Sequence, residues 1–332
     1  MADSHKEALA IRFDAIGGPE VLRLVDVEVG DPGPGEIRLR QTVAGLNYID
    51  TYHRTGLYPM PLPSGIGMEG AGVVEAVGAG VDALRVDDRV GYCWGPIGAY
   101  ATHRLIAADR VVKLPDGVSD DVAAAVLLKG CTTEFLVERC GKVEAGQTVL
   151  VQAAAGGVGL LLVQWLKHLG ARVIGTASSD AKAALATAAG ADAMIVYSRD
   201  AVAPRVRELT GGHGVDVVFD GVGKSTFEGS LDSLKRRGLL ASFGNASGPV
   251  GAVDFAILAR KGSLFATRPT LFDYYTNREE IERYAGRVLD LVARGVLDVR
   301  IDQRYALAEA AQAHRDLEAG KSIGSSVFVL ED

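Results

Sequence analysis

The residues best suited to chemistry form a glycine-rich turn near the middle of the chain. Residues 153–159 read Ala-Ala-Ala-Gly-Gly-Val-Gly, after the apolar run Thr148–Gln152 and before the helical segment Leu160–Leu169. Glycines let a backbone approach a pyrophosphate closely, and the amide groups at the start of a helix favour its negative charge. The order strand, turn, helix predicts a dinucleotide site. The alternative is a glycine turn that serves close packing alone.

The following strand indicates which dinucleotide is bound. NAD sites place an acidic side chain about twenty residues after the first glycine, beside the ribose hydroxyls. Here Arg172–Thr176 leads into Ala177-Ser178-Ser179, and no acid stands at the end of the strand. Hydroxyls and the ammonium of Lys182 suit a 2′-phosphate, which a carboxylate would repel. We therefore expect NADPH, with Asp180 as the cap of the next helix; in the alternative, Lys182 is a solvated surface lysine.

A second glycine pattern, Gly221-Val222-Gly223-Lys224-Ser225-Thr226, resembles the end of a phosphate-binding P-loop. The glycine required five positions before Gly223 is replaced by Val218, which lies inside an apolar strand. A kinase or ATPase is therefore disfavoured. Because the turn follows a strand of the same alternating region, Val222 is expected to line part of the cofactor crevice.

Both turns belong to a regular alternation of strands and helices. The strands are near-continuous apolar runs, which are typical of strands buried on both faces of a parallel sheet. We expect a Rossmann-type doubly wound α/β domain with strands at Thr148–Gln152, Arg172–Thr176, Ala193–Tyr197, Val215–Phe219, Gly238–Phe243 and Ser263–Ala266.

The flanking segments have a different pattern. Up to Leu114, short β-type runs alternate with Gly and Pro, which predicts a compact β-rich domain. Its strands are expected at Ala8–Phe13, Val21–Val27, Glu36–Ala44, Ala71–Val77, Asp88–Cys93, Ala99–Ile106 and Val111–Leu114. Helices are expected at Asp120–Leu128, Thr132–Cys140, Arg278–Arg294 and Ala308–Ala319, and a last strand at Ser325–Leu330.

Length, composition and charge narrow the class of protein. A chain of 332 residues exceeds what one hydrophobic core usually supports, so two domains are expected. The net charge of −7 disfavours nucleic-acid binding, which depends on Lys and Arg. The N-terminal residues show no signal-peptide pattern, and no apolar run reaches the ~18 residues of a membrane span. Three widely spaced cysteines suit a reducing compartment, so we expect a cytoplasmic protein without membrane contact.

Further motifs extend over essentially the whole chain. They are Gly45-Leu46-Asn47-Tyr48-Ile49-Asp50-Thr51-Tyr52, Gly56-Leu57-Tyr58-Pro59, Gly67-Met68-Glu69-Gly70-Ala71-Gly72, the glycine turn, Arg236-Arg237-Gly238, Ser242-Phe243-Gly244-Asn245 and Thr267-Arg268-Pro269. Together they resemble the zinc-independent quinone oxidoreductase branch, of the ζ-crystallin type, in the medium-chain dehydrogenase/reductase superfamily. The resemblance implies a GroES-like catalytic domain at residues 1–127 and 270–332, and a Rossmann NADPH-binding domain at residues 128–269.

The resemblance also implies catalysis without a metal ion. Alcohol dehydrogenases of the same superfamily bind catalytic zinc through a cysteine and the His of a Gly-His-Glu motif, and this sequence has Asn47 and Met68 at those places. An amide and a thioether cannot replace a thiolate and an imidazole as zinc ligands. Without a Lewis acid to stabilise an alkoxide, the expected reaction is reduction of an already electrophilic acceptor, such as a quinone.

The resemblance assigns roles to individual residues. Asn47 and Tyr52 would lie beside the nicotinamide in a cleft between the domains. Tyr52 would donate a hydrogen bond to the acceptor oxygen or, in the alternative, pack structurally on a short helix. The other implied cofactor residues are Thr132, Gly156, Gly157 and Val158 for the phosphates and ribose, Ser178, Lys182 and Tyr197 for the 2′-phosphate and adenine, Phe243, Gly244, Asn245 and Pro269 for the nicotinamide side, and Lys321 as the nearest basic residue to the C-terminus.

These observations together predict NADPH-dependent reduction of quinones. One alternative is reduction of an enone or enoyl thioester at the same site. Another is a structural or RNA-binding role of the ζ-crystallin type, against which the acidic charge argues. The strand Ser263–Ala266 closes one edge of the predicted sheet, and an exposed apolar edge strand can pair with its own copy. We therefore expect a homodimer formed through this edge.

Overall fold

The chain forms two compact units in the computed structural model, which describes residues 6–330; residues 1–5 and 331–332, at the outer ends of the predicted catalytic domain, lie outside the described residues. Unit 1 consists of Met1–Cys131, Tyr275–Gly295 and Val299–Asp332, and unit 2 of Thr132–Tyr274 and Val296–Asp298. The resemblance implied domain boundaries after residues 127 and 269. The first junction of the structure lies within helix α2 (Asp120–Glu134), and the second follows Tyr274.

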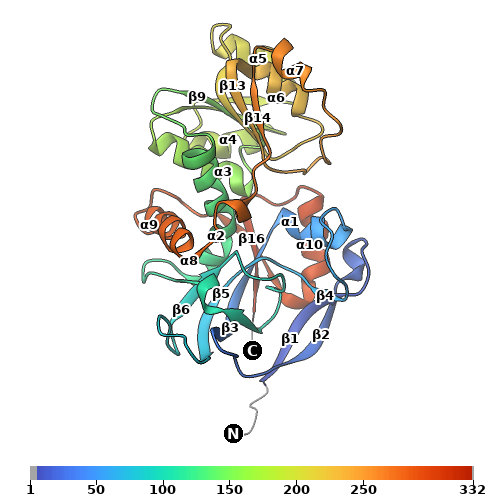
Figure 1. The fold of residues 1–332 in the computed structure, drawn as a ribbon. Coiled ribbons are helices and arrows are strands. Elements are labelled where there is room, and N and C mark those ends of the chain that lie inside the picture. Colours follow the sequence, from blue (N-terminus) through green and yellow to red (C-terminus); the bar gives the residue numbers. More distant parts are fainter. Residues whose placement is uncertain (1–5, 331–332) are drawn as a thin grey trace. The chain divides into compact units, whose positions relative to one another are not determined.

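Unit 2 is built on a six-stranded parallel sheet with the strand order β11-β10-β9-β12-β13-β14 (Figure 1). Fully buried side chains such as Leu150, Ile174 and Val218 form its core, because both faces of these strands are covered. The predicted doubly wound Rossmann arrangement is therefore confirmed. The strands are β9 (Thr148–Val151), β10 (Arg172–Ala177), β11 (Ala193–Val196), β12 (Val215–Asp220), β13 (Leu234–Ser242) and β14 (Phe265–Thr267).

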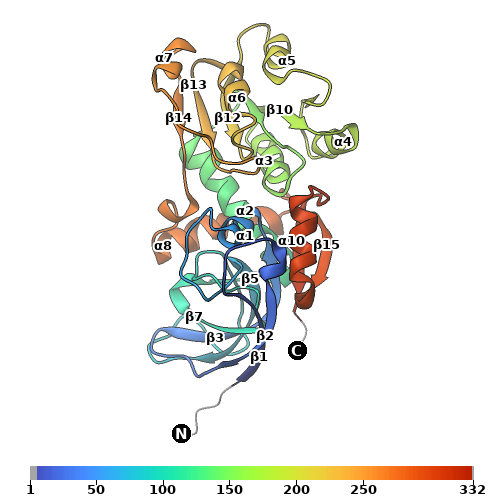
Figure 2. The same ribbon diagram turned by 90° about the vertical axis from the view of Figure 1, so that its right-hand side faces the viewer.

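The helices of unit 2 connect these strands. Helix α3 packs on β9 and β10 and helix α4 on β10 and β11, whereas α6 packs on β12 and β13. Since strand–helix–strand connections are right-handed, the change of direction between β11 and β12 puts the helices of the two halves on opposite faces (Figure 2). The helices are α3 (Gly157–His168), α4 (Asp180–Ala188), α5 (Val202–Leu209), α6 (Phe227–Ser233) and α7 (Ala256–Arg260).

Unit 1 contains two sheets. The larger has seven strands in the order β15-β16-β3-β5-β6-β8, with β7 paired to β3, and the smaller has the order β2-β1-β4. Strand β16, near the C-terminus, pairs antiparallel with β3, near the N-terminus, so the predicted use of both chain ends in one β-rich domain agrees with the sheet. The strands are β1 (Lys6–Phe13), β2 (Arg23–Val29), β3 (Glu36–Leu46), β4 (Ser64–Gly65), β5 (Glu69–Val77), β6 (Arg89–Tyr92), β7 (His103–Ala107), β8 (Val112–Lys113), β15 (Ile301–Ala306) and β16 (Ser325–Val329).

The helices differ from the predicted ones at residues 120–140 and at residues 278–294. The two helices expected between residues 120 and 140 are continuous, since α2 runs past Gly130 into the π-helical turn Phe135–Cys140. Gly130 is required by packing, because a Cβ there would lie 2.5 Å from Cγ1 of Val288. The other helices are α1 (Tyr48–Thr55), α8 (Arg278–Glu280), α9 (Gly286–Ala293) and α10 (Ala310–Glu318), with a π-helical turn at Ile281–Ala285 between α8 and α9. Within residues 6–330, no helix is long and apolar enough to cross a membrane.

Candidate functional site

The glycine turn lies between β9 and α3, as predicted. Gly156 precedes the helix in extended conformation, and α3 begins at Gly157. A Cβ on Gly159 would lie 2.3 Å from the carbonyl oxygen of Ala153, so only glycine fits there. The amides of Gly157 and Val158 open the first helical turn, where an α-helix offers its N–H groups no carbonyl partner. This geometry suits an anion held by main-chain donors.

A buried polar network fixes the turn to its neighbouring strands. The backbone N–H of Ala153 donates to the hydroxyl of Thr176, and that hydroxyl donates to the side-chain oxygen of Gln152 at 2.8 Å. The Gln152 amide donates to the Ser230 hydroxyl at 3.0 Å, which donates to Asp220 at 2.7 Å. These side chains come from the carboxyl ends of β9, β10 and β12 and from α6, so the network holds one edge of the sheet in a fixed shape.

The turn after β12 lies at the same edge. The Asp220 carboxylate accepts hydrogen bonds from the backbone N–H groups of Val222 and Gly223 at 2.8 and 3.1 Å. A Cβ on Gly244 would lie 2.2 Å from the carbonyl oxygen of Gly221, so the loop after β13 runs directly against this turn. The predicted residues Val222, Phe243, Gly244 and Asn245 are therefore brought together, whereas the P-loop interpretation remains without its glycine.

The turn after β10 corrects one prediction and adds a residue. Ser179 rather than Asp180 caps α4, because its hydroxyl accepts from the backbone N–H of Lys182. Asp180 is the first helical residue, and both oxygens of its carboxylate accept from the guanidinium of Arg199 at 2.7 and 2.9 Å. The cap was misassigned because serine and aspartate are equally good N-caps and stand side by side. Arg199, which follows β11, is an additional residue at this place, and it is not among the residues predicted from the sequence.

Ser178 and Tyr197 follow the neighbouring strands β10 and β11, and Lys182 lies in the first turn of α4. The backbone N–H of Tyr197 donates to the carbonyl of Ala177 at 3.1 Å, and the hydroxyl of Ser198 donates to the carbonyl of Ser178. Tyr197 is about half exposed, with 53% of its surface accessible. The exposed ring of Tyr197, the neighbouring serines and the lysine in the first turn of α4 are groups suited to an adenine and a phosphate.

In unit 1, Asn47 belongs to a buried cluster of polar side chains. Its side-chain Nδ2 donates to Oε2 of Glu69 at 2.8 Å, and Oε1 of Glu69 accepts from the backbone N–H of Leu128 at 2.7 Å. The ammonium of Lys129, which is 8% exposed, lies 3.7 Å from the same Oε2 and donates to the carbonyl of Leu46 at 3.4 Å. Burial raises the pKa of Glu69, and Lys129 opposes that rise. Sequence analysis missed Glu69 and Lys129 as site residues.

Helix α1 begins at this cluster and carries Tyr52. Asp50 is fully buried, and its Oδ2 accepts from the backbone N–H of Asn47 at 2.9 Å and from the hydroxyl of Tyr100 at 2.7 Å. Its Oδ1 has no hydrogen-bond partner among the described residues. Burial raises the pKa of Asp50 from 3.8 to about 7. The ring of Tyr52 packs against those of Tyr48 and Tyr58, with centroids 5.8 and 5.2 Å away, so the packing role expected in the alternative is present.

A chain of hydrogen bonds leads from Asp50 toward the surface of unit 1. The hydroxyl of Tyr100 lies 3.3 Å from Nε2 of His314, and Nδ1 of His314 lies 2.9 Å from Nη1 of Arg54. Arg54 also pairs with Glu318 at 2.6 Å. Because an arginine can only donate, Nδ1 of His314 accepts and Nε2 carries the proton. Burial lowers the pKa of His314 to about 3, so its ring is neutral near pH 7.

The positions at which zinc ligands were considered hold groups of another kind. Met68 is buried, and the Asn47 amide is directed at a carboxylate. Within residues 6–330, no three His, Cys, Asp or Glu side chains are grouped as metal ligands. Cys93, Cys131 and Cys140 are free thiols, and burial together with the neighbouring Cys131 thiol holds the pKa of Cys93 well above its ordinary value.

The structure places Thr132, Pro269 and Lys321 without testing whether they contact the cofactor. Thr132 lies within α2 at the start of unit 2. Pro269 follows β14 directly after Arg268, whose guanidinium donates to the carbonyl of Ser242 at 2.8 Å. Lys321 lies in unit 1, where its ammonium pairs with Asp316 at 3.3 Å. Their contact with a cofactor remains a prediction.

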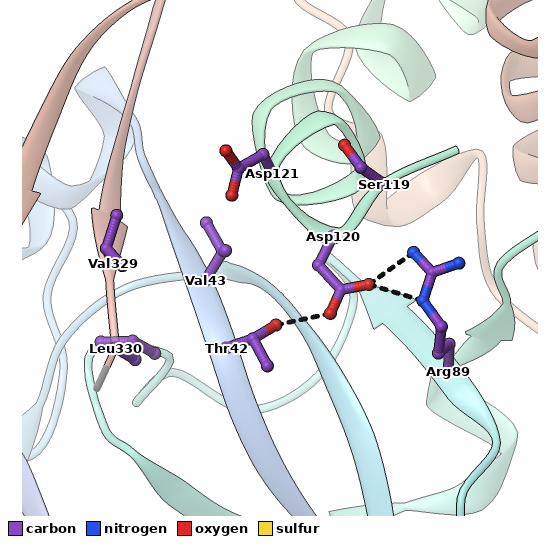
Figure 3. A pocket seen from close by; sticks show the side chains of 8 residues that line it. All are labelled: Thr42, Val43, Arg89, Ser119, Asp120, Asp121, Val329 and Leu330. Atoms are coloured by element: carbon purple, nitrogen blue, oxygen red, sulfur yellow. Dashed lines mark hydrogen bonds and ion pairs between the residues drawn. The ribbon is translucent and has the colours of Figure 1, made fainter. Parts of the chain in front are cut away.

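A pocket of about 530 Å³ in unit 1 contains none of the predicted site residues (Figure 3). Its Asp120 accepts from the hydroxyl of Thr42 at 2.7 Å and from the guanidinium of Arg89, and Asp121 pairs with Arg304 at 2.8 Å. Because these charges satisfy one another, the pocket offers no surplus charge for a ligand. Its lining residues are Thr42, Val43, Arg89, Ser119, Asp120, Asp121, Val329 and Leu330.

Comparisons with known proteins agree in sequence and in fold. Residues 33–116 match the alcohol dehydrogenase GroES-like domain, and residues 157–294 match the zinc-binding dehydrogenase family. The chain is 52% identical to a quinone oxidoreductase of Pseudomonas aeruginosa, over 97% of this chain and 99% of that protein. It is 45% identical to a 2-haloacrylate reductase of a Burkholderia species, over 94% and 96%. The crystal structure of Escherichia coli quinone oxidoreductase complexed with NADPH is similar with a TM-score of 0.95, at 45% identity and 97% and 99% coverage.

Proposed function

The chain belongs to the quinone oxidoreductase branch of the medium-chain dehydrogenase/reductase superfamily, and we propose that it reduces quinones with NADPH without a metal ion. The observation that carries the proposal is similarity over nearly the full length to quinone oxidoreductases, one of which was solved with NADPH. The geometry of both units supports it, as the following residues indicate.

The carboxyl edge of the sheet in unit 2 fits NADPH. Glycine at 159 and at 244 keeps two turns so close to neighbouring backbone that a Cβ would lie within about 2.3 Å of a carbonyl oxygen. The amides of Gly157 and Val158 are available for the pyrophosphate at the helix start. Ser178 and Lys182 supply a hydroxyl and a positive charge for the 2′-phosphate, and Arg199 compensates the nearby Asp180 carboxylate, which would otherwise repel that phosphate.

Residues of unit 1 orient the acceptor in this proposal. NADPH, when bound, supplies the hydride. Asn47 is held in one orientation by Glu69, and Tyr52 is held by two aromatic neighbours, so both side chains are fixed before an acceptor arrives. In this proposal the phenol of Tyr52 donates a hydrogen bond to the acceptor oxygen, which polarises the carbonyl as negative charge develops on it.

The description of the matched family names zinc, but the ligand chemistry of this chain differs. Asn47 offers an amide that is already hydrogen-bonded to Glu69, and Met68 offers a thioether. Neither is a preferred ligand of Zn²⁺, which favours thiolate, imidazole and carboxylate. A quinone is electrophilic enough to accept a hydride from a positioned donor when hydrogen-bond donors replace the Lewis acid.

Reduction of an electron-poor double bond is the second candidate. A 2-haloacrylate reductase is among the similar proteins at 45% identity. A 2-haloacrylate contains a carbon–carbon double bond conjugated to a carboxylate, which also accepts a hydride. Quinones are favoured because several similar proteins carry the name quinone oxidoreductase, at up to 52% identity. The acidic net charge of −7 gives no support to an RNA-binding role.

Steady-state kinetics with several acceptors test this proposal. Oxidation of NADPH is followed by absorbance with benzoquinone, phenanthrenequinone, a 2-haloacrylate and an enone, each against a reaction without protein. The proposal predicts the highest kcat/KM for a quinone. A higher kcat/KM for the haloacrylate or the enone would replace the quinone as substrate class, and no turnover with any acceptor would contradict the proposed activity.

We also propose that the protein is a cytoplasmic homodimer. Strand β14 ends the six-stranded sheet, and Phe265 on it is 61% exposed, with Phe255 nearby in the chain 82% exposed. An apolar edge strand invites pairing with a second copy. Light scattering after size exclusion should give twice the monomer mass for the wild type and the monomer mass for Phe265→Asp. A monomeric wild type would contradict the proposed dimer.

The proposed cytoplasmic location is supported by the three free thiols, because unpaired cysteines suit a reducing compartment.

A further inference from the structure

Ala153, the first residue of the glycine turn, has a backbone conformation that alanine rarely adopts. Its φ is 52°, in the left-handed region, where the Cβ of an ordinary residue lies too close to the following carbonyl oxygen. Asparagine and aspartate can offset this strain with a polar side chain, but alanine cannot. Strained backbone persists only where surrounding contacts hold it, and such residues cluster at functional sites. The contacts that hold Ala153 are therefore candidates for a role at the cofactor site.

The conformation of Ala153 directs its carbonyl group toward the start of α3. That carbonyl accepts from the backbone N–H of Gly156 at 2.9 Å. A Cβ on Gly159 would lie 2.3 Å from the same oxygen, so the helix begins directly against it. The first helical turn presents the amides of Gly157 and Val158. Relaxation of Ala153 would move its carbonyl and, with it, the anion-binding start of the helix.

Four buried side chains hold the backbone N–H of Ala153 in place. They are Thr176, Gln152, Ser230 and Asp220, which we call the Asp220 network, and each is at most 4% exposed. Hydrogen bonds of 2.7–3.1 Å lead from the N–H of Ala153 through these side chains to the carboxylate. Burial of polar groups costs free energy unless they are hydrogen-bonded, and each of these side chains is. The strained residue is thus tied to a paired, water-excluded network.

The hydrogen bonds of the Asp220 network run in one direction only. A backbone N–H can only donate and a carboxylate can only accept, so both ends are fixed. The Thr176 hydroxyl accepts from Ala153 and donates to Gln152. The Ser230 hydroxyl accepts from the Gln152 amide and donates to Asp220; if that amide were reversed, the single hydroxyl proton would face two acceptors. The Asp220 carboxylate therefore holds Gln152 in one orientation and, through it, the hydroxyl that binds Ala153.

We propose that the residues of the Asp220 network are positioning residues, which hold Ala153 in the left-handed conformation and so shape the glycine turn before a dinucleotide arrives; this inference rests on the proposed binding of NADPH at this turn. The apparent dissociation constant rises in proportion when the binding-competent shape is populated only in part. The left-handed strain of an alanine corresponds to about a tenfold preference for other conformations. Loss of the network should therefore weaken dinucleotide binding by about that factor.

A substitution remote from Ala153 and one at Ala153 itself test the proposal together. Ser230→Ala removes the hydroxyl that joins Gln152 to Asp220, and Ala153→Gly removes the strain, because glycine adopts left-handed backbone without a steric cost. Ser230→Ala is made in the wild type and in an Ala153→Gly background. The matched control background is Lys142→Gly, since Lys142 is an exposed left-handed residue of unit 2 that precedes β9, whereas the glycine turn follows β9.

Three measurements are made on every variant. Fluorescence titration gives the dissociation constants of NADPH and NADH, and thermal unfolding gives the midpoint. Hydrogen exchange followed by mass spectrometry reports the opening of the backbone amides of residues 153–159 in the absence of cofactor.

Ser230→Ala should weaken the binding of NADPH and of NADH about tenfold each, because both carry the pyrophosphate. In the Ala153→Gly background the same substitution should leave both dissociation constants nearly unchanged, whereas in the Lys142→Gly background it should keep its full effect. Exchange of the amides of residues 153–159 should follow the same pattern. A serine that serves only the stability of the fold would lower the thermal midpoint in every background, and Ala153→Gly would not rescue binding.

An effect of Ser230→Ala on binding that persists in the Ala153→Gly background would overturn the inference, and so would unchanged binding by Ser230→Ala in the wild type. If Ser230→Ala does not fold, Thr176→Val replaces it with the same expected results, because valine keeps the shape of threonine and breaks the network next to Ala153. A wild type that binds neither dinucleotide would instead contradict the proposed function, and the amide exchange would still test the network.

Discussion

Asp50 gives the most quantitative prediction, because its carboxyl group is buried with one oxygen unpartnered among the described residues. In the unfolded chain it loses its proton near the ordinary pKa of 3.8, whereas burial in the folded unit raises the pKa to about 7. Proton release therefore favours the unfolded state between these values. Stability falls as the pH rises from about 4 to about 7, and the loss is constant above that range.

The magnitude follows from the same two values. One pKa unit corresponds to about 1.4 kcal/mol, so the full rise corresponds to about 4 kcal/mol, of which about 2–3 kcal/mol falls between pH ~5 and pH ~8. Asp50→Asn keeps a side-chain oxygen for Tyr100 and Asn47 but carries no titrating proton. The variant should gain that amount of stability relative to the wild type when the pH is raised.

Urea unfolding at both pH values provides the measurement. Trp94 lies in unit 1 and Trp165 in unit 2, so fluorescence in a Trp165→Phe background reports the unfolding of unit 1 alone. Asp26→Asn, at an exposed position of the same unit, serves as control and should leave the pH dependence unchanged. Parallel pH dependences of the wild type and Asp50→Asn would refute the reasoning about this buried carboxyl group.

Three further variants test the proposed cofactor and acceptor contacts. Lys182→Glu should weaken NADPH binding by about tenfold or more and leave NADH binding nearly unchanged, as measured by fluorescence titration. Lys142→Glu, at an exposed position, is the control, and equal effects of Lys182→Glu on both cofactors would exclude a contact with the 2′-phosphate. Arg199→Ala should weaken NADPH binding roughly tenfold, and the additional substitution Asp180→Ala should restore it, because the carboxylate that repels the 2′-phosphate is then absent. A double variant that binds NADPH as weakly as Arg199→Ala would show that Arg199 binds the phosphate directly. Tyr52→Phe should lower kcat about 10²-fold at an unchanged thermal midpoint, and an unchanged kcat would assign the tyrosine to packing.

Much of the fold follows from local patterns in the sequence. Five strands of the Rossmann sheet were predicted within about two residues of their observed bounds, because each is an apolar run with turns at its ends. Strand β13 begins four residues before its predicted start, because its first part contains the exposed charged residues Lys235, Arg236 and Arg237. Strand β15 was missed because its side chains alternate between partly buried and exposed and include Asp302, Gln303 and Arg304. Such an edge strand has no apolar run to reveal it. The gap expected between helices at Asp120–Leu128 and Thr132–Cys140 is absent, because Gly130 lies within α2, where a Cβ would lie 2.5 Å from Cγ1 of Val288.

The candidate site was predictable where its residues are consecutive. The glycine turn and the serines after β10 follow from spacing, because neighbouring residues in a turn share one function. The pairs Lys129–Glu69 and Asp180–Arg199 join residues that are far apart in sequence, and a charged residue read alone is most simply interpreted as solvated. Only the fold shows that Lys129 is buried and that the charge of Asp180 is compensated.

The central claim is hydride transfer from NADPH to a quinone without a metal ion. It is tested most directly by measuring kcat/KM for NADPH with benzoquinone on protein dialysed against a chelator and shown by elemental analysis to contain no metal. We expect full activity, unchanged when Zn²⁺ is added back, and a lower kcat/KM with NADH. Loss of activity on dialysis and its recovery with Zn²⁺ would contradict it.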